Sequence, residues 1–527
     1  MTNENKIKIH LAVNKNEIIN KDNFKESFFN ISKPLYILDT DTGNPEKQFK
    51  AYVPALLPQN LGDNDFKKRH NLKYAYIAGA MANGISSVTM IQAMAENGMT
   101  GFFGAGGLSL DQIENAIIEL KNTLKTKTFG FNLIHSPNEP DHEMAVANLY
   151  VKHRIRLVSA AAFMRMTLPL VYYRVKGIYR NPDEKIVVPN KIIAKVSRVE
   201  VAREFFSPPP KKLVDQLITM GLITETEAEL SRHIPMAQDL TAEADSGGHT
   251  DNRPALALLP IMLSLKNEFA NKFNFSDKLC VGLAGGIATP ESAAAAFQMG
   301  AGYILTGSIN QPCIETGITE QAKIMLTQAQ QADVAMAPAA DMFEIGARVQ
   351  VLKRGTMFAI RAEKLYNTYK NYESFDQVPL KERQQIEKKI LMADFETKWL
   401  DTKQFFENSN NYTEIQKAEE NPKQKMALVF RSYLGLSSKW AINGDKTKTI
   451  DYQIWCGPAM GAFNQWVKGS FLESHVNREV AVIALNLLFG AAFCIRKSWF
   501  QNQNINIPSD ILSFPPSPKG QLMDMLS

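Results

Sequence analysis

The sequence has few cysteines, no long uninterrupted apolar run and little excess of either charge. Its four cysteines lie far apart and form no Cys-x-x-Cys pair; they are Cys280, Cys313, Cys456 and Cys494. Such sparse cysteines argue against a disulfide framework or a metal site of the zinc type, and they fit a reducing cytoplasm. The 59 basic and 54 acidic residues leave a net charge of only +5, which argues against a dedicated nucleic-acid-binding protein.

Signals for membrane targeting are also scarce. The first ten residues, MTNENKIKIH, lack the apolar core of a signal peptide. The most apolar stretch, residues 480–495, is short for a membrane span and contains Asn486 and Gly490. We therefore expect a buried helix at this position and no membrane span.

The length and composition indicate several structural units around a large core. Apolar residues make up 45% of the 527 residues, and the length suggests two to four domains, although a barrel uses roughly 250 residues as one unit. We expect an N-terminal lobe or cap over residues 1–70, with β-like runs at 7–13, 34–38 and 49–57. A barrel is expected over 71–312, a mainly helical accessory domain over 313–450, and a C-terminal segment packing back on the barrel over 451–527.

From Lys73 onward, short apolar runs alternate with amphipathic stretches. The runs predict strands at 73–80, 100–104, 129–134, 155–159, 191–196, 236–244, 279–284 and 303–306. Ser109 is expected to cap a helix whose apolar face includes Ile113, Ile117 and Leu120. About eight β-α units favour the α/β class and a closed TIM-type (β/α)8 barrel, with an open doubly wound sheet as the alternative. A segment at about 207–235, which begins with three prolines after Ser207, is interpreted as an insertion.

The strongest local motif is the glycine-rich run from Val281 to Ser308. One strand is expected to end at Gly285-Gly286-Ile287 and the next at Gly307-Ser308, with a helix beginning at Thr289-Pro290 between them. Glycines let the backbone approach an anion closely, and N–H groups at a helix start can point toward it. In barrels the last strands commonly build a phosphate site. The alternative is a pair of tight turns without a ligand. The Rossmann fingerprint G-x-G-x-x-G is absent from this run.

A second motif, AEADSGGHTDNRP at residues 242–254, follows the sixth expected strand. Gly247 and Gly248 would free the backbone so that His249 projects from the loop. A histidine there can act as a general acid or donate a hydrogen bond to a developing oxyanion. The alternative is a histidine that merely bonds to loop carbonyls. Glu243 and Asp245 are expected to orient the loop, and no metal site is predicted.

Small or polar residues at other strand ends could frame a flat ring. Ala80 and Met81 follow the first barrel strand in GAMANG, where close packing is the alternative explanation. Asn132 and Lys195 lie within or at the end of strands, and buried polar side chains need partners. The acceptor-rich edge of a flavin would suit both, and a lysine there would stabilise an anionic reduced flavin.

Taken with their spacing, these motifs resemble the nitronate monooxygenase family and the related FMN-dependent enoyl-acyl carrier protein reductases. Those families share a Gly-Gly-His segment, an Ala-Gly-Gly-Ile loop and a following Gly-Thr or Gly-Ser turn, here at 247–249, 284–287 and 307–308. Longer stretches, including DVAMAPAADMFEIGARVQVLKRGTMFAIRAEKLY and DYQIWCGPAMGAFNQW, resemble the PfaD-type enoyl reductases. These act in trans in polyunsaturated fatty acid and trans-acyltransferase polyketide synthases. The likeness covers nearly the whole chain.

The resemblance implies a reaction and its partners. NADPH would be the hydride donor that reduces FMN, and the flavin would reduce a 2-enoyl thioester on an acyl carrier protein. His249 would donate the α-carbon proton or polarise the thioester carbonyl, while Lys195, Asn132 and the Ala80-Met81 backbone would frame the flavin. Thr250-Asp251 departs from the simple oxygenase pattern and puts nitronate chemistry in doubt.

Three further expectations concern the rest of the chain. The helical insertion is expected to cover the barrel mouth, and Lys353, Arg354 and Arg361 could either meet an acidic carrier or lie on a solvated helix face. Cys456 has no base nearby in sequence, which favours a buried structural thiol over a nucleophile. The sequence leaves the oligomeric state open, with a homodimer as one option, and a flavin oxygenase or a non-catalytic flavin-binding subunit remain alternative functions.

Overall fold

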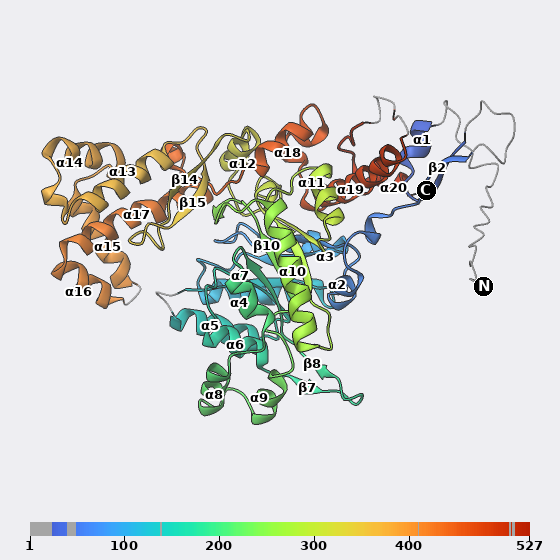
Figure 1. Cartoon of the computed structure of the whole chain (residues 1–527). Coiled ribbons are helices and arrows are strands. Elements are labelled where there is room, and N and C mark those ends of the chain that lie inside the picture. The colour runs from blue at the N-terminus through green and yellow to red at the C-terminus, as the bar shows by residue number, and fades with distance from the viewer. Residues whose placement is uncertain are drawn as a thin grey trace.

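The structure, a computed structural model, describes residues 24–38, 49–136, 140–408, 411–504, 507 and 512–526. At its centre is a closed barrel of eight parallel strands (Figure 1). In order around the barrel they are β3 (Tyr76–Ala78), β4 (Thr100–Phe103), β5 (Gly130–Ile134), β6 (Leu157–Ala161), β9 (Lys191–Val196), β10 (Asp239–Glu243), β12 (Cys280–Ala284) and β13 (Ile304–Thr306). Because β13 pairs again with β3, the predicted barrel is confirmed and the open-sheet alternative is wrong.

Helices on the outside of the barrel follow most of these strands. They are α3 (Val88–Glu96), α4 (Leu110–Leu124), α5 (Pro140–Lys152), α6 (Leu168–Val175), α7 (Val199–Phe206), α10 (Ala255–Phe273) and α11 (Pro290–Gln298). Ser109 begins α4 with a capping box, in which its hydroxyl accepts from the N–H of Gln112 and the Gln112 side chain accepts from the N–H of Ser109. Ile113, Ile117 and Leu120 are buried, as their spacing predicts.

The barrel interior is a packed core. Alternate strand residues point inward, among them Ile77, Phe102, Ile193 and Leu305, all of which are buried in one cluster. The short helix α2 (Asn64–Arg69) closes the end at which the strands begin, and its Phe66 stacks on Tyr303 with ring centroids 4.3 Å apart. This filling leaves the opposite end, where the strands finish, as the place for a site.

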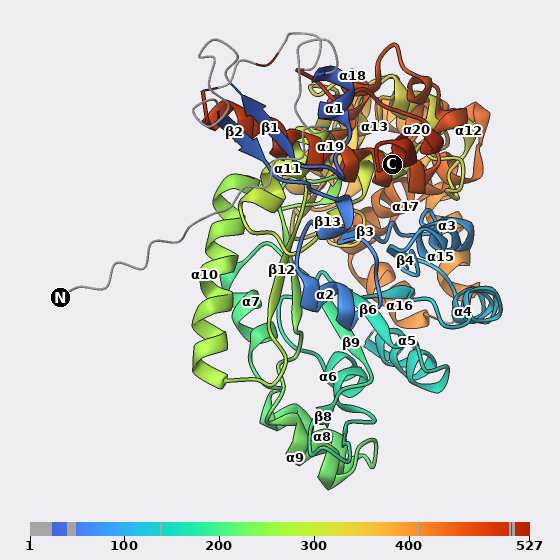
Figure 2. The same cartoon turned by 90° about the vertical axis from the view of Figure 1, so that its right-hand side faces the viewer.

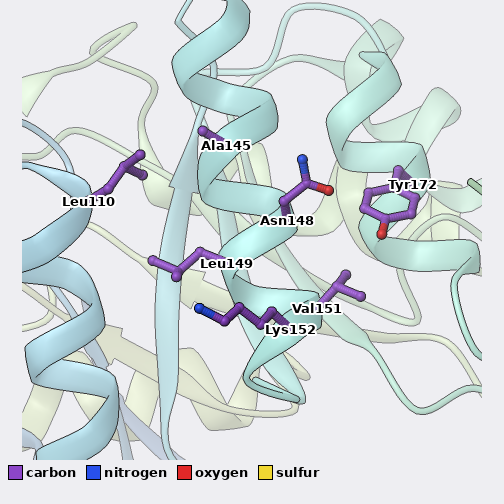
Figure 3. A pocket seen from close by; sticks show the side chains of 7 residues that line it. All are labelled: Leu110, Ala145, Asn148, Leu149, Val151, Lys152 and Tyr172. Carbon is purple, nitrogen blue, oxygen red and sulfur yellow. The ribbon is translucent and has the colours of Figure 1, made fainter.

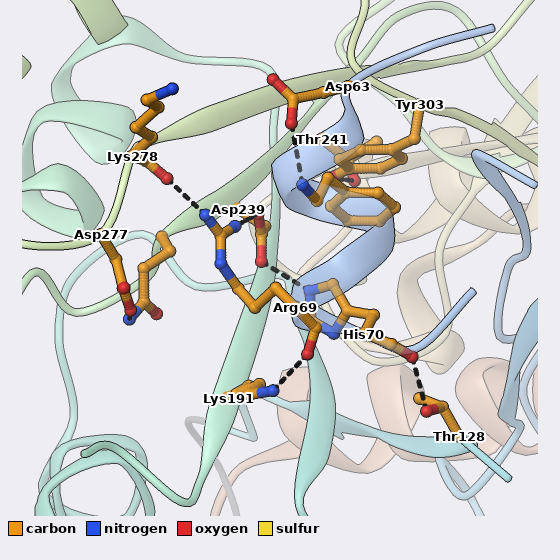
Figure 4. Close-up of polar contacts among 12 residues, drawn as sticks. Asp63, Arg69, His70, Thr128, Lys191, Asp239, Thr241, Asp277, Lys278 and Tyr303 are labelled. Carbon is orange, nitrogen blue, oxygen red and sulfur yellow. Dashed lines mark hydrogen bonds and ion pairs between the residues drawn. The ribbon is translucent and has the colours of Figure 1, made fainter. Parts of the chain in front are cut away.

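Charged side chains seal the closed end of the barrel (Figure 4). Asp239, at the start of β10, is 1% exposed and accepts from His70 Nε2 at 2.7 Å and from Arg69. Although burial favours its protonated form, His70 and Arg69 hold the pKa of Asp239 below its ordinary value. Burial lowers the pKa of His70 despite its carboxylate partner. Lys191 donates to the carbonyl of Arg69, so α2 is tied to two strands.

The N-terminal region forms a small two-stranded antiparallel sheet. Strand β1 (Leu35–Leu38) pairs with β2 (Phe49–Val53), and the helix α1 (Phe24–Phe29) precedes them. The predicted runs at 34–38 and 49–57 therefore correspond to these two strands. The predicted run at 7–13 lies outside the described residues.

The expected insertion at 207–235 contains two helices, α8 (Lys211–Thr219) and α9 (Glu225–Ser231). A short antiparallel hairpin, β7 (Tyr179–Arg180) and β8 (Ile186–Val187), was not predicted. These four elements lie together at the bottom of the view in Figure 1, away from the helical unit. They extend the closed end of the barrel.

The chain beyond the barrel forms a helical unit that begins with strands. After α12 (Glu320–Thr327), the strands β14 (Val334–Pro338) and β15 (Arg348–Leu352) form a hairpin. The helices α13 (Phe358–Asn371), α14 (Leu380–Ile386), α15 (Phe395–Asn408), α16 (Tyr412–Glu420) and α17 (Pro422–Asn443) follow. The prediction of a mainly helical domain thus missed this hairpin, because its two short strands lie among longer helices.

The C-terminal helices pack back on the barrel and on the N-terminal sheet. They are α18 (Ala459–Val467), α19 (Val480–Asn502) and α20 (Lys519–Asp524). Gly490 of α19 approaches the start of α11 so closely that a Cβ atom there would lie 2.6 Å from Pro290 Cβ. Arg496 donates to the carbonyls of Asn30 and Lys33. Among the described residues, only α19 is long and apolar enough to cross a membrane, and 94% of its apolar window is buried inside the protein.

Candidate active site

The carboxyl ends of β12 and β13 present an open cradle of backbone N–H groups. Gly285 and Gly286 have φ values of +85° and +75°, which L side chains rarely adopt. Cβ atoms placed at Gly286 and Gly307 would meet nothing within 4 Å. Within the described residues, the N–H groups of Gly286, Ile287, Gly307 and Ser308 donate no hydrogen bond. Converging free N–H groups on two adjacent strands form an anion-binding concavity.

The start of helix α11 does not contribute in the expected way. The N–H groups of Ala288 and Thr289 both donate to Ser292 Oγ at 2.9 Å. Thr289 in turn accepts from the N–H of Ser292, so the helix start is capped by its own side chains. The expectation that free N–H groups at Thr289-Pro290 point outward is therefore wrong for residues 288 and 289. The free N–H groups belong to the two turns instead.

Lys195 and Glu243 form an ion pair at the ends of β9 and β10. Lys195 Nζ lies 2.7 Å from Glu243 Oε1, and the two side chains are 18% and 22% exposed. The strands are in parallel register with Lys195 opposite Thr241, an inward position. An ammonium group is thus held at the open end of the barrel, where it faces any ligand that enters.

Asn132 lies nearby on β5 and is nearly buried. Its Oδ1 accepts from the N–H of Ala105 at 2.7 Å, while its Nδ2 donates to no described residue. Ser159 is opposite Asn132 in the parallel pairing of β5 and β6, and its buried Oγ has no partner within the described chain. Buried polar atoms without partners are rare in folded proteins. These two side chains therefore indicate that a polar ligand belongs beside them.

The Ala80-Met81 segment is pinned by its own loop. Ser86 Oγ accepts from the N–H of Met81 and donates to the carbonyl of Gly79, both at 2.9 Å. Gly104 permits the close approach, since a Cβ atom there would overlap the Met81 carbonyl. Ala80 is half-buried at the end of β3, beside the turn after β13. The segment thus forms a rigid edge of the barrel mouth.

The Gly-Gly-His loop is fixed to the helical unit by strand pairing. Gly248 and His249 form the short strand β11, which pairs antiparallel with β15. Gly247 packs against the backbone of Cys456, where a Cβ atom would come within 2.9 Å. Gly248 has a φ of +80°. The two glycines therefore serve a close approach and a left-handed turn, which explains why they precede the histidine.

His249 forms an ion pair that the sequence did not predict. Its Nε2 lies 3.2 Å from Asp341 Oδ1, and the side chains are 47% and 61% exposed. Partial desolvation disfavours the charged imidazole, but hydrogen bonding and attraction from Asp341, with a contribution from Glu243, raise the pKa of His249 above its ordinary value. A histidine with a raised pKa is better populated as a proton donor near neutrality.

Two aspartates hold the loop on either side of His249. Asp245 accepts from Asn252 Nδ2 at 2.8 Å and from Gln350 Nε2 at 2.9 Å. Asp251 accepts from Ser197 and from Arg198 through two nitrogens. The Arg198 guanidinium lowers the pKa of Asp251 to about 2. The loop is therefore anchored to β15 and to the end of β9.

Some site residues could not be located from the sequence. Asp341 and Gln350 come from the β14-β15 hairpin, and the backbone at Trp455 to Gly457 closes the loop from behind. The N–H of Gly457 donates to Ser308 Oγ at 3.2 Å, which connects this segment to the cradle. The hairpin and the segment from Trp455 to Gly457 belong to motifs that carry the family resemblance. However, these residues lie 90 to 210 positions beyond His249 in the chain. No local pattern indicates such a distant contact.

Cys456 and Arg361 have structural surroundings, whereas Lys353 and Arg354 are exposed. Cys456 is fully buried, and burial raises the pKa of its thiol to about 12, as expected for a structural cysteine. Arg361 is paired with the buried Asp451, and Arg354 lies 3.4 Å from Asp333. Arg361 is therefore not free to meet a carrier protein, while Lys353 stays exposed.

Two surface depressions lie away from the strand ends. One, of about 550 Å³, is lined by residues of α4, α5 and α6 such as Leu110, Leu149 and Tyr172 (Figure 3). The other, of about 670 Å³, lies along the inserted helix α8. Neither contains a residue of the barrel mouth, and both are open to solvent. The strand ends therefore remain the candidate site.

Comparison with known proteins places the chain in a family. Residues 64–365 match the family described as Nitronate monooxygenase, and residues 372–452 match the inserted helical domain of [acyl-carrier-protein] S-malonyltransferase. The enoyl reductase domain of MlnA, from the macrolactin biosynthesis cluster of Bacillus amyloliquefaciens, is 40% identical. That structure superposes with a TM-score of 0.80, over 84% of this chain and 99% of that one.

Curated relatives belong to biosynthetic systems. The polyketide biosynthesis protein PksE of Bacillus subtilis is 45% identical over 86% of this chain. A polyunsaturated fatty acid synthase subunit from Thraustochytrium is 39% identical over 96% of it. The chain spans 58% and 35%, respectively, of the lengths of these two relatives. It belongs to the nitronate monooxygenase family and, within that family, to the PfaD-type enoyl reductases.

Proposed function

We propose that this chain is an FMN-dependent enoyl reductase that uses NADPH to reduce 2-enoyl thioesters carried on acyl carrier protein domains. The observation that carries the reaction class is the 40% identity to the MlnA enoyl reductase domain across 99% of that chain. The relatives in polyketide and polyunsaturated fatty acid systems support carrier-bound substrates. A cytoplasmic location is part of the same proposal, since all four cysteines are free and buried.

The residues of the barrel mouth fit FMN. Its phosphate would be held by the free N–H groups of Gly286, Ile287, Gly307 and Ser308, and Gly285 would allow the turn. Asn132 Nδ2 and the orphan Ser159 Oγ suit the polar edge of the ring. Lys195 would supply positive charge there, and the rigid Ala80-Met81 backbone would border the ring.

Separate residues of the chain have separate roles in the proposed reaction. FMN held at this site would supply, once reduced, the hydride for the β-carbon of the enoyl thioester. Lys195 stabilises negative charge at the barrel mouth, and its partner Glu243 fixes the position of the ammonium. His249 holds the proton for the α-carbon, on a loop that Gly247 and Gly248 shape. The pairing of this loop with β15 keeps the imidazole in place as substrate enters.

Anaerobic stopped-flow spectroscopy tests the proposal. FMN-loaded protein mixed with NADPH should lose its flavin absorbance rapidly, and a crotonyl-carrier thioester should restore it. Butyryl-carrier thioester, which lacks the double bond, serves as the matched control and should leave the flavin reduced.

Two other outcomes would reject the proposal. Reoxidation by oxygen with nitronates, and not by the enoyl thioester, would assign the chain to the oxygenases of its family. Protein that is colourless and takes up no FMN would instead support a non-catalytic subunit.

A further inference from the structure

The hairpin of the helical unit brings a carboxylate to the candidate proton donor. Strand β15 pairs His249 with Val349, and β14 pairs Pro338 with Arg348. Asp341 lies in the turn that joins these two strands, so the turn extends past the paired residues toward His249. The Nε2–Oδ1 distance of 3.2 Å results from this register.

Asp341 is itself held in position and ionised. Although partial desolvation favours its protonated form, His249 and the backbone N–H groups of Asp341 and Met342 lower the pKa of Asp341. The carboxylate therefore stays charged over the range in which a histidine titrates.

Other charged groups near His249 bond to partners of their own: Asp251 to Arg198, and Asp245 to the amides of Asn252 and Gln350. Glu243 forms its ion pair with Lys195 at 2.7 Å, so much of its charge is compensated. On the hairpin, Arg348 is bonded to Glu363 at 2.7 Å. Asp341 is thus the carboxylate within hydrogen-bond range of the imidazole.

We propose that Asp341 is a positioning residue that holds His249 as an imidazolium, with Nε2 toward the carboxylate and Nδ1 left to deliver the proton. This inference rests on the proposed function, which it deepens by naming the residue that controls the acid. After hydride addition at the β-carbon, the electron pair of the carbon–carbon double bond takes the proton at the α-carbon. The Nδ1–H bond breaks, its electron pair stays on the ring, and water restores the proton.

The sign of the pH dependence follows from the ion pair. Asp341 raises the pKa of His249, so the acid remains protonated to higher pH than an isolated histidine. Activity that needs this acid is present below the pKa of His249 and falls as the pH rises through it. Removing the negative charge should therefore move that fall to lower pH.

Histidine NMR measures this coupling without any turnover. Protein labelled on its eight histidines is titrated with and without Asp341→Asn, and the His249 signal is assigned by its loss in His249→Ala. Asn keeps an acceptor oxygen but removes the charge. The midpoint of His249 should move to lower pH in Asp341→Asn and return toward the wild-type value in Asp341→Glu. An unchanged midpoint would overturn the inference, whatever the substrate proves to be.

Half-reaction kinetics provide the second readout. Asp341→Asn should leave flavin content and reduction by NADPH unchanged, and should move the alkaline fall of enoyl-dependent reoxidation to lower pH. Its loss of rate should not exceed that of His249→Ala, which removes the acid and should cost about a hundredfold or more. Equal slowing of both half-reactions at every pH would show a structural role and reject the inference.

A matched control comes from another histidine–carboxylate pair. His475 Nε2 lies 2.5 Å from Glu320 Oε2 on the helical side of the molecule. Glu320→Gln removes a carboxylate from a histidine outside the barrel mouth and should leave the pH profile unchanged. If wild-type protein reduces no enoyl thioester while NMR still shows the His249–Asp341 coupling, the proposed function fails and the pairing stands.

Discussion

Asp239 is a fully buried carboxylate whose two oxygens are used by two different side chains. One accepts from Arg69 and the other from His70, and all three groups lie at the closed end of the barrel (Figure 4). A buried charge is tolerated only when it is paired and hydrogen-bonded. The two bonds of Asp239 therefore hold α2 against the ends at which the strands begin. In barrels, residues at this end contribute to stability and those at the opposite end to catalysis.

Asp239→Asn should destabilise the protein by about 3–5 kcal/mol, because it leaves the largely buried Arg69 without its counter-charge and removes the carboxylate that bonds to His70. Urea denaturation followed by tryptophan fluorescence measures this as a lower midpoint. The control is Asp65→Asn, which removes a solvent-exposed ion pair with Lys278 at the same end and should cause no measurable change. A wild-type midpoint for Asp239→Asn would show that the pair does not stabilise the barrel.

Acid should weaken the same cluster in two stages. Burial lowers the pKa of His70 from 6.5, so the unfolded chain binds this proton more readily and stability decreases as pH falls below that value. The lowered pKa of Asp239 contributes stability above about its ordinary value of 3.8, which is lost as pH falls further through the folded-state pKa. Urea midpoints measured from pH 8 to pH 2 should therefore decrease first below about pH 6.5 and again below about pH 3.8. In Asp239→Asn the second stage should be missing.

The two turns after β12 and β13 act together as one structural element. Each glycine turn leaves N–H groups free, and the parallel pairing of the strands places the turns side by side. Gly490 of α19 packs against Pro290, which follows the first turn. The cradle is thus supported from outside by a buried helix.

Gly286→Asp should expel FMN from this cradle. A carboxylate about 4 Å from the phosphate would repel it by about 4 kcal/mol, which corresponds to roughly a thousandfold weaker binding. Gly286→Asn is the matched control, because Asn tolerates the left-handed conformation as well as Asp does and carries no charge. Flavin-to-protein ratios after purification distinguish the two. Equal, full flavin content in both variants would place the phosphate elsewhere.

The sequence allowed the barrel strands to be predicted because each combines an apolar run with a following turn. All eight were located, and Gly285, Gly286 and Ser109 marked their turns and a cap. The hairpins β7-β8 and β14-β15 were missed, since two-residue strands and a strand pair within a helical region give weak periodic signals. His249 was found from its glycines, whereas Asp341 was not, because its contact depends on strand pairing between distant segments.

At the scale of the whole molecule, several segments that are distant in the sequence lie at the open end of the barrel. The helical unit reaches it through the pairing of β15 with β11, and the C-terminal region through Gly457 and α19. Figure 2 shows the C-terminal helices and the N-terminal sheet on the same side of the barrel, opposite α8 and α9. A ligand bound at the open end would therefore lie beside parts of the molecule that are far apart in the sequence.

FMN should consequently stabilise the whole chain. A ligand that binds only the folded state at a hundred times its Kd adds about 2.7 kcal/mol. Apoprotein should therefore unfold at a lower temperature than FMN-loaded protein, as measured by circular dichroism. Riboflavin has the same ring and no phosphate, so it should stabilise much less at equal concentration if Gly286, Ile287, Gly307 and Ser308 hold the phosphate. Equal stabilisation by the two flavins would show that the phosphate adds nothing to binding. It would then not be held by these four N–H groups.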